Sequence, residues 1–312
     1  MSALICGSMA YDNIMVFPGR FKESILPDQL HILNVSFLVP EMRKEFGGCA
    51  GNVAYNLSAL GANPLIMATV GTDFDGYAQR LADLDLDVRF VRTIDDRLTA
   101  QAYITTDLDD NQITAFHPGA MDYSHENRVP VDAGVTVGMV SPDGRQGMIE
   151  HADQFADAGI PFIFDPGQGL PMFDGEDLKR FIDQATWLAV NDYEGQMLQE
   201  RTGWSAEEIS KHVEAMIVTR GGDGSSIFVD SKEIEIPAVT AADILDPTGC
   251  GDAYRAGLLF GIMRNMSWED TGRLASLLGS IKIAHRGTQN HDINFEGIAR
   301  AFDAAFGYEL SA

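Results

Sequence analysis

The sequence has few basic residues for its length. Lysine and arginine together number 22 in 312 residues, against 46 aspartate and glutamate residues, so the formal net charge is −24. Nucleic acids and anionic membranes are held mainly by lysine and arginine side chains, and this balance argues against both as the main partner. A small anionic substrate stays compatible with the charge if a few basic side chains converge locally.

Cysteine is also scarce. The three cysteines, Cys6, Cys49 and Cys250, lie far apart, and no C-x-x-C pair or cysteine–histidine cluster has zinc-ligand spacing. A dispersed, odd number of thiols fits a reducing compartment. No basic segment precedes an apolar stretch at the N-terminus, and no run approaches the roughly 18 apolar residues of a membrane span. We therefore predict a cytoplasmic protein with neither a membrane nor a nucleic acid as partner.

Two nucleotide-binding motifs are missing. The sequence contains no G-x-x-x-x-G-K-[ST], which excludes a P-loop enzyme. It has no G-x-G-x-x-G opening a helix after the first predicted strand, which disfavours a dinucleotide-dependent dehydrogenase. Hydrophobic residues nevertheless make up 45% of the chain, an ordinary globular proportion that excludes intrinsic disorder.

Short apolar segments alternate with segments of helical period along most of the chain. Several apolar segments are hydrophobic on both faces, which is typical of parallel strands covered by helices on both sides. The alternation predicts an α/β fold with a doubly wound, mostly parallel sheet. Predicted strands are residues 4–8, 65–70, 135–140, 162–164, 187–190, 216–219 and 226–229. Predicted helices are residues 50–60, 77–84, 146–158, 176–185, 194–202 and 295–306, with two more beginning at the caps Ser205 and Ser267.

One region departs from this alternation. Residues 100–106 and 112–117 have a strand pattern and flank a short polar turn, which predicts a β-hairpin. Residues 14–39 have little helical period and are candidates for further strands. We interpret both segments as a small β-sheet lid, formed by about 14–45 and 98–118 and inserted in a single domain of residues 1–312.

The segment DPTGCGD at 246–252 carries the strongest chemical signal. Its glycines let the backbone approach a ligand, and a helix is predicted to begin at about Gly251, where free N–H groups bind anions. Asp252 in the first helical turn is stabilised as a carboxylate by the helix dipole. A carboxylate beside a row of amides suits phosphoryl transfer, with Asp252 accepting the proton of the attacking hydroxyl. As an isolated motif, an aspartate that caps the helix is the simpler interpretation.

Two further glycine-rich segments are ambiguous alone. GGCAGN at 47–52 leads into a helix and places Asn52 where it can bind hydroxyl groups, or it is only a turn before that helix. VTRGGDG at 218–224 follows a predicted strand, where open α/β sheets bind nucleotides, or it is a hairpin turn.

Together the segments resemble a known family. Residues 47–71 (GGCAGNVAYNLSALGANPLIMATVG) and 246–259 (DPTGCGDAYRAGLL) resemble the two signatures of the ribokinase-like PfkB carbohydrate kinases. NDYE at 191–194 is similar to the family's N-x-x-E motif, and TRGGDG at 219–224 to its nucleotide loop. The resemblance covers nearly the whole chain, and Cys250, where the family usually has a small residue such as alanine, is the main departure.

The resemblance implies specific roles. Asp252 would be the catalytic base, and an anion hole would be formed by the amides of Gly249, Cys250 and Gly251. Asp12, Gly48 and Asn52 would bind sugar hydroxyls, and the ATP site would include Asn191, Thr219, Gly221 and Gly224. Glu194 would organise Mg²⁺ through water, because carboxylates at a phosphate site need a cation between them. Many members also bind a monovalent cation such as K⁺ beside the anion hole, which here would involve Asp246.

The sequence defines the acceptor of the phosphoryl group less well than it defines the reaction. The whole-chain pattern looks most like bacterial nucleoside kinases of the family, which phosphorylate the primary hydroxyl of adenosine, inosine or guanosine. Phe116 in the lid could stack on a purine, although lid packing accounts for it equally well, and Gln168 could hydrogen-bond a base edge or a sugar. A fructokinase or ribokinase-type sugar kinase is the alternative acceptor class. The family also suggests lid closure and a homodimer through the lid.

Two hypotheses from other classes stay open. A purine or sugar sensor that kept the fold and lost catalysis is disfavoured by the intact Gly251–Asp252 pair. A nicotinamide-dependent oxidoreductase is disfavoured by the missing glycine fingerprint. Arg220, Lys282 and Arg286 are candidate positive groups near ATP, with plain surface solvation as the competing interpretation.

Overall fold

A nine-stranded sheet organises the chain. The computed structural model describes residues 1–25, 34–109 and 111–311. The strand order is β13-β12-β11-β10-β9-β8-β1-β4-β5, parallel throughout except for the final antiparallel strands β12 and β13. The strands are β1 (Ser2–Cys6), β4 (Asn63–Val70), β5 (Asp87–Thr93), β8 (Val135–Val140), β9 (Phe162–Phe164), β10 (Trp187–Asn191), β11 (Ala215–Thr219), β12 (Ser225–Val229) and β13 (Lys232–Ile236). The predicted doubly wound sheet is confirmed.

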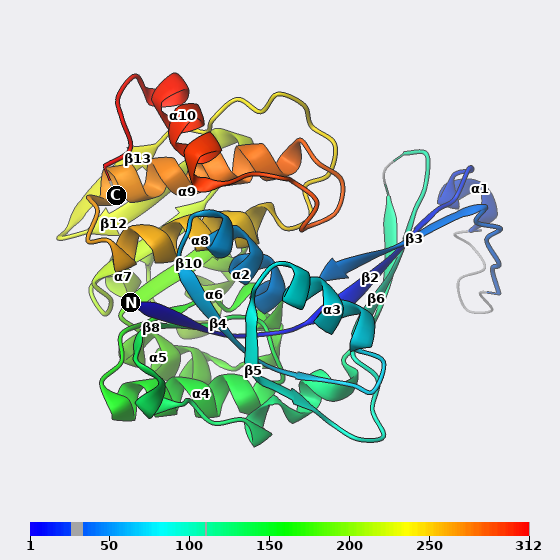
Figure 1. The fold of residues 1–312 in the computed structure, drawn as a ribbon, viewed down its shortest axis with the longest axis horizontal. Helices are drawn as coiled ribbons and strands as arrows, with labels where there is room; N and C mark the ends of the chain where they lie inside the picture. Colours follow the sequence, from blue (N-terminus) through cyan, green and yellow to red (C-terminus); the bar gives the residue numbers. More distant parts are fainter. Residues whose placement is uncertain (26–33, 110, 312) are drawn as a thin grey trace.

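Helices cover both faces of this sheet (Figure 1). One apolar core lies under α2, α3, α8, α9 and α10, and a second lies on the opposite face under α4 to α7. Alternate residues of β1 enter opposite cores, Ile5 the first and Leu4 the second, as the two-residue period of a strand requires. The helices are α2 (Cys49–Ala59), α3 (Asp75–Asp83), α4 (Arg145–Ala158), α5 (Gly175–Gln184), α6 (Asp192–Thr202), α7 (Ala206–Ser210), α8 (Cys250–Met263), α9 (Trp268–Ile283) and α10 (Phe295–Phe306). No helix in the described part of the chain is long and apolar enough to span a bilayer.

All seven predicted strands of this sheet are present within two residues of their expected bounds. The two edge strands, β5 and β13, were not predicted. Their sequences, DVRFVRT and KEIEI, each contain three charged residues, and charged side chains are typical of edge strands. A search for continuous apolar segments therefore passes over them.

A separate four-stranded sheet, here called the small sheet, has the order β3-β2-β6-β7. Its strands are β2 (Ala10–Val16), β3 (Glu41–Gly47), β6 (Ala100–Thr106) and β7 (Gln112–His117). The hairpin β6–β7 was predicted. The strands expected within 14–39 lie instead at the ends of that segment and beyond it. The short helix α1 (Phe21–Ser24) follows β2, and residues 26–33 lie outside the described residues.

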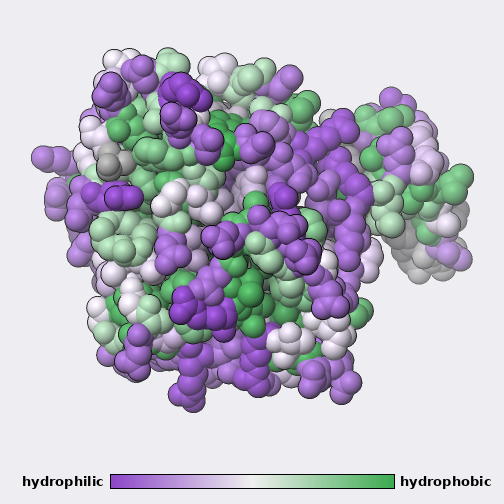
Figure 2. Space-filling view, viewed as in Figure 1, coloured by the Kyte–Doolittle hydropathy of each residue, from purple (hydrophilic) through white to green (hydrophobic). Residues whose placement is uncertain are grey.

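The small sheet projects sideways from the body (Figure 1). Hydrophilic residues cover much of it in the view of Figure 2, and hydrophobic residues gather at its outer end. Phe17, Phe21 and Phe37 form an aromatic cluster in the segment between β2 and β3, with ring centroids 4.8–5.9 Å apart. This cluster gives the projecting segment a small core of its own.

The order of strands places a topological switch point next to β1. From β1 the chain winds outward to β4 and β5, and then returns to β8 on the other side of β1. Open α/β sheets bind ligands at the carboxyl ends of strands at such a switch point. Here the backbone after β1 contacts the backbone after β8, because the Ser8 amide donates to the Pro142 carbonyl at 3.0 Å.

Candidate active site

Two helix N-termini bring Asn52 and Asp252 together. Asn52 lies in the first turn of α2 and Asp252 in the first turn of α8. The Asn52 amide nitrogen Nδ2 donates to Asp252 Oδ2 at 2.8 Å. The two glycine-rich segments that resembled kinase signatures therefore meet at one point of the structure.

The anion hole predicted from the sequence is only partly open. Gly249, the N-cap of α8, has φ +80°, and a Cβ atom there would lie 3.0 Å from Thr288 Cγ2, so the position needs glycine. The Cys250 amide donates to the Pro247 carbonyl at 3.2 Å. The Gly249 and Gly251 amides have no acceptor in the described part of the chain and are free to bind an anion.

Asp252 has the electrostatics of a general base. Burial raises its pKa to about 6, the nearby Asp165 carboxylate adds to the rise, and the Asn52 hydrogen bond opposes it. A base with this pKa is ionised at neutral pH and binds a proton more readily than an ordinary aspartate.

Asn52 is held in place by residues that the sequence analysis did not single out. Its Oδ1 accepts a hydrogen bond from Gln289 Nε2 at 3.0 Å, and the same nitrogen lies 2.6 Å from the Tyr77 hydroxyl. Tyr77 in turn donates to the Gly47 carbonyl at 2.9 Å. This chain of buried hydrogen bonds fixes the amide so that its NH₂ group faces Asp252.

A buried ion pair lies behind Asp252. Arg255, one turn later on α8, binds Asp165 Oδ1 through Nε at 3.2 Å and Nη2 at 2.9 Å, and both side chains are 6% exposed. Glu194 Oε2 is 4.0 Å from the same Arg255 Nη2. Both residues carry a signal in the sequence, since Asp165 ends a predicted strand and Arg255 follows Asp252 at helical spacing.

The N-x-x-E motif forms a helix cap. Asn191 Oδ1 accepts from the Glu194 amide at 2.7 Å, and Glu194 Oε2 accepts from the Asn191 amide at 2.8 Å, a reciprocal capping box at the start of α6. Burial raises the pKa of Glu194, and Asp165 adds to this. The motif thus fixes a carboxyl group close to the Asp165–Arg255 pair.

The start of α2 sits directly on the end of β1. Gly48 has φ +88°, and a Cβ atom there would lie 2.5 Å from the Ser8 carbonyl oxygen. Asp12 lies on β2 against Gly47, whose added Cβ would be 2.5 Å from Asp12 Oδ2. Burial raises the pKa of Asp12 to about 6, with further contributions from Asp246 and Glu45.

The predicted nucleotide loop is also a hairpin turn. Thr219 ends β11, and the Arg220 amide donates to the Gly224 carbonyl at 2.8 Å, which closes the turn into β12. Gly224, with φ +84°, would place a Cβ 2.2 Å from the Ile236 carbonyl oxygen, whereas a Cβ at Gly221 meets nothing within 4 Å. The binding-loop and hairpin interpretations therefore describe one structure at the carboxyl edge of the sheet.

Phe116 and Gln168 lie at different edges of this region. Phe116 on β7 is 52% exposed and pairs with Ala102, which pairs with Asp12, so the three side chains share one face of the small sheet. Gln168 is an exposed residue of the short 3₁₀ helix that follows β9.

All three oxygens of Asp246 accept hydrogen bonds. Its Oδ1 accepts from the Thr248 amide at 3.0 Å, and its Oδ2 accepts from the Gly287 amide at 3.0 Å and lies 3.4 Å from Arg43 Nη2. Its backbone oxygen accepts from Lys282 Nζ at 2.7 Å. Although burial opposes ionisation, these amides hold the pKa of Asp246 below its usual value. Every oxygen of Asp246 therefore already has at least one hydrogen-bond donor.

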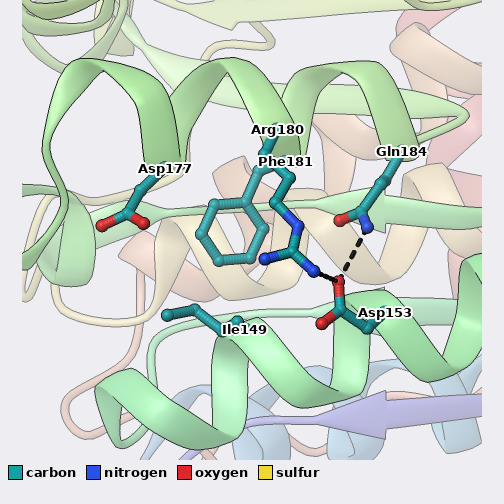
Figure 3. A pocket seen from close by; sticks show the side chains of 6 residues that line it. All are labelled: Ile149, Asp153, Asp177, Arg180, Phe181 and Gln184. Carbon is teal, nitrogen blue, oxygen red and sulfur yellow. Dashed lines mark hydrogen bonds and ion pairs between the residues drawn. The ribbon is translucent and has the colours of Figure 1, made fainter.

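Other features lie apart from the site. Figure 3 shows a small pocket between α4 and α5, where Arg180 and Gln184 donate to Asp153 Oδ1 at 2.6 and 2.8 Å. None of the residues discussed above lines it, and its polar groups bind one another. Within the described residues, no group of three or more histidine, cysteine, aspartate or glutamate side chains could hold a metal ion.

Comparison with known proteins decides the family. Residues 8–294 match the profile of the pfkB family of carbohydrate kinases. The chain belongs to the pfkB family of carbohydrate kinases. The predicted family and the predicted phosphotransferase are thereby confirmed.

Individual proteins that are similar to this pfkB kinase include nucleoside kinases. A nucleoside kinase of Methanocaldococcus jannaschii is 32% identical over 83% of this chain and 85% of that protein. A structure of Burkholderia thailandensis nucleoside kinase with inosine has 52% identity and a TM-score of 0.92, covering 99% of this chain and 100% of that one. The same enzyme with ADP and inosine has 53% identity and a TM-score of 0.90, covering 99% and 98%.

Cys250 of this pfkB kinase lies in surroundings that disfavour its thiolate form. Burial raises the pKa of its thiol to about 11, and the thiolate is the reactive form of cysteine. The raised pKa favours the interpretation of Cys250 as a packed residue over that of a redox-sensitive one.

Proposed function

We propose that the chain phosphorylates the primary hydroxyl of a purine nucleoside with ATP as the donor. The observation that carries the proposal is the Asn52–Asp252 contact beside the free amides of Gly249 and Gly251. Similarity to nucleoside kinases, including a relative of 52% identity solved with inosine, supports a nucleoside as the acceptor.

The proposed reaction assigns each site residue a task. The acceptor oxygen forms a bond to the γ-phosphorus, and the bond from that phosphorus to the β,γ-bridging oxygen breaks. The hydroxyl proton passes to Asp252, and ADP leaves. The amides of Gly249 and Gly251 stabilise the phosphoryl oxygens, while Asn52 keeps the carboxylate oriented. Asp12 and Gly48 would contact the ribose, and Thr219, Gly221 and Gly224 would border the nucleotide.

Glu194 fits the proposed role toward Mg²⁺. The hydrogen bond by which Glu194 caps α6 uses its Oε2 atom. Magnesium binds few protein carboxylates and keeps water and substrate phosphates as its other ligands. The lack of a preformed carboxylate cage in the described residues agrees with such a site. When bound, magnesium supplies charge neutralisation on the phosphates.

The small sheet is proposed to act as a lid. Phe116 and Asp12 share the face described above, so a base and its ribose could be covered together. Closure would keep water from competing as phosphoryl acceptor. We further propose a homodimer through this sheet, because the side chains of Met42 and Tyr103 are 67% and 42% exposed. A cytoplasmic location stays a prediction.

A substrate panel tests the proposal. ADP release is measured with ATP, Mg²⁺ and, separately, inosine, adenosine, guanosine, ribose and fructose. We expect kcat/KM for at least one purine nucleoside to exceed that for either sugar by about a hundredfold or more, since the base contributes binding energy that a free sugar lacks. Faster turnover of fructose or ribose would instead favour a sugar kinase. ATP binding with no turnover of any acceptor would favour a sensor.

A further inference from the structure

Lys282 is a lysine with no exposed surface. It lies in the last turn of α9 and is 0% exposed, whereas lysines are almost never fully buried unless they are paired. Its Nζ donates to the backbone carbonyls of Asp246 at 2.7 Å and His285 at 3.1 Å. The surface interpretation of this residue made from the sequence is therefore wrong.

The two carbonyls belong to the two loops that border the anion hole. Asp246 begins the segment that leads into Gly249 and α8, and His285 begins the segment that follows α9 and contains Gly287 and Thr288. The second segment touches the first, since the Gly287 amide binds Asp246 Oδ2 and Thr288 packs against Gly249. One ammonium group thus joins both loops from the inside.

Family resemblance led us to expect a monovalent cation between these loops. Each candidate oxygen already accepts a hydrogen bond, namely both carboxylate oxygens and the carbonyl of Asp246 and the carbonyl of His285, so a cation here would have to displace donors. A positive charge is nevertheless present there, on a side chain. Arg43 of β3 adds a second positive charge 3.4 Å from Asp246.

We propose that the Lys282 ammonium replaces the monovalent cation, so that phosphoryl transfer in this chain is independent of K⁺. Lys282 is a positioning residue. It fixes the carbonyls of two loops and thereby the orientation of the amides at the start of α8, and it adds a fixed positive charge behind them. Burial lowers the pKa of the amine, and the Asp246 carboxylate offsets part of this shift.

The inference rests on the kinase activity proposed above, and cation dependence tests it. ADP formation by the wild type is measured with Mg²⁺·ATP and its best acceptor, in buffers whose monovalent cation is tetramethylammonium, and then with added K⁺ or NH₄⁺. We expect kcat of the wild type to change by less than about twofold. Activation by K⁺ of about tenfold or more would overturn the proposal, whereas no turnover of any acceptor would instead contradict the proposed function.

Substituting the lysine gives the second arm. Lys282→Ala removes the ammonium and leaves space, and we expect kcat to fall by about tenfold or more. Added NH₄⁺ or K⁺ should restore a substantial part of the loss, and tetramethylammonium should not. Lys282→Met keeps the packing volume but blocks the space, so it should lose activity and respond less to either ion. Circular dichroism establishes that each variant is folded.

A matched control separates charge at this site from charge in general. Lys232→Met removes an exposed lysine of β13 and should leave kcat and its ion response unchanged. A folded Lys282→Ala protein whose lost activity no ion restores would show that the lysine is only structural and would overturn the proposal. Rescue is a readout that a packing role does not produce.

Discussion

Asn52 and Asp252 are 200 residues apart in the sequence and in contact in the structure, with Nδ2 of the first 2.8 Å from Oδ2 of the second. Each lies in the first turn of a helix that begins after a glycine with positive φ. The contact orients the Asp252 carboxylate through its Oδ2 atom.

Removing the base tests the mechanism directly. Asp252→Asn preserves the shape of the side chain but cannot accept a proton, and general bases contribute about 10²- to 10⁴-fold to rate. We expect kcat to fall within that range, with ADP affinity changed little, as measured by calorimetry. A variant that retains near wild-type kcat would remove Asp252 from the mechanism.

The rate should depend on pH through the same group. Burial raises the pKa of Asp252 to about 6, and the carboxyl must be ionised to act as a base. The rate should therefore be level at neutral pH and fall as the pH drops below about 6, close to one decade per pH unit. Asp12, whose pKa burial also raises to about 6, steepens this fall if it must be ionised to bind ribose. A pH profile of kcat/KM that stays level down to pH of about 5 would contradict this assignment.

Stability should show the opposite trend. The pKa of Asp252 is higher in the folded than in the unfolded chain, so its contribution to stability is present below about pH 4 and lost as pH rises through about 6. Asp252→Asn should consequently raise the free energy of unfolding at pH 7.5 by about 2 kcal/mol, with little gain at pH 4. Urea denaturation at the two pH values measures the difference. The exposed Asp157→Asn serves as control and should change stability at neither pH.

Substitution of Gly249 should affect both stability and kcat, and a second glycine separates the two effects. Gly249→Ala introduces a Cβ at φ +80° and places it 3.0 Å from Thr288, next to the amides that would bind the phosphoryl group. Gly159→Ala imposes similar strain at φ +65° after α4, where a Cβ meets nothing within 4 Å. Both should lose about 1 kcal/mol of stability. Only Gly249→Ala should lower kcat, by about tenfold or more, and equal activity of the two variants would exclude a role for this turn in catalysis.

The sequence predicted the central strands well because burial on both faces leaves an apolar signature, as in β4 and β10. It did not predict the edge strands β5 and β13, because each has three charged residues and no continuous apolar run. The small sheet was foreseen, but its strand bounds were displaced, since β3 (EMRKEFG) has four charged residues and no apolar run.

For the site, the sequence indicated residues that carry a local motif and missed those that act through distant partners. Asp252 and Asn52 stand in recognisable glycine-rich segments, and the structure brings them together. Gln289 and Arg255 were given no role from the sequence, although Arg255 lies within the 246–259 segment. Their importance depends on contacts with Asn52 and Asp165 that only the fold creates. Lys282 was a candidate positive group near ATP with surface solvation as the competing interpretation, because burial of a lysine cannot be deduced from one sequence.

The chain passes from β3 of the small sheet to α2 of the body through a single residue. β3 ends at Gly47 and α2 begins at Cys49, so only Gly48 separates the strand that moves with any lid from the helix that carries Asn52. A connection of one residue allows little relative movement between β3 and α2. If the small sheet closes as the proposed lid, its movement would be transmitted to the N-terminus of α2, where Asn52 contacts Asp252.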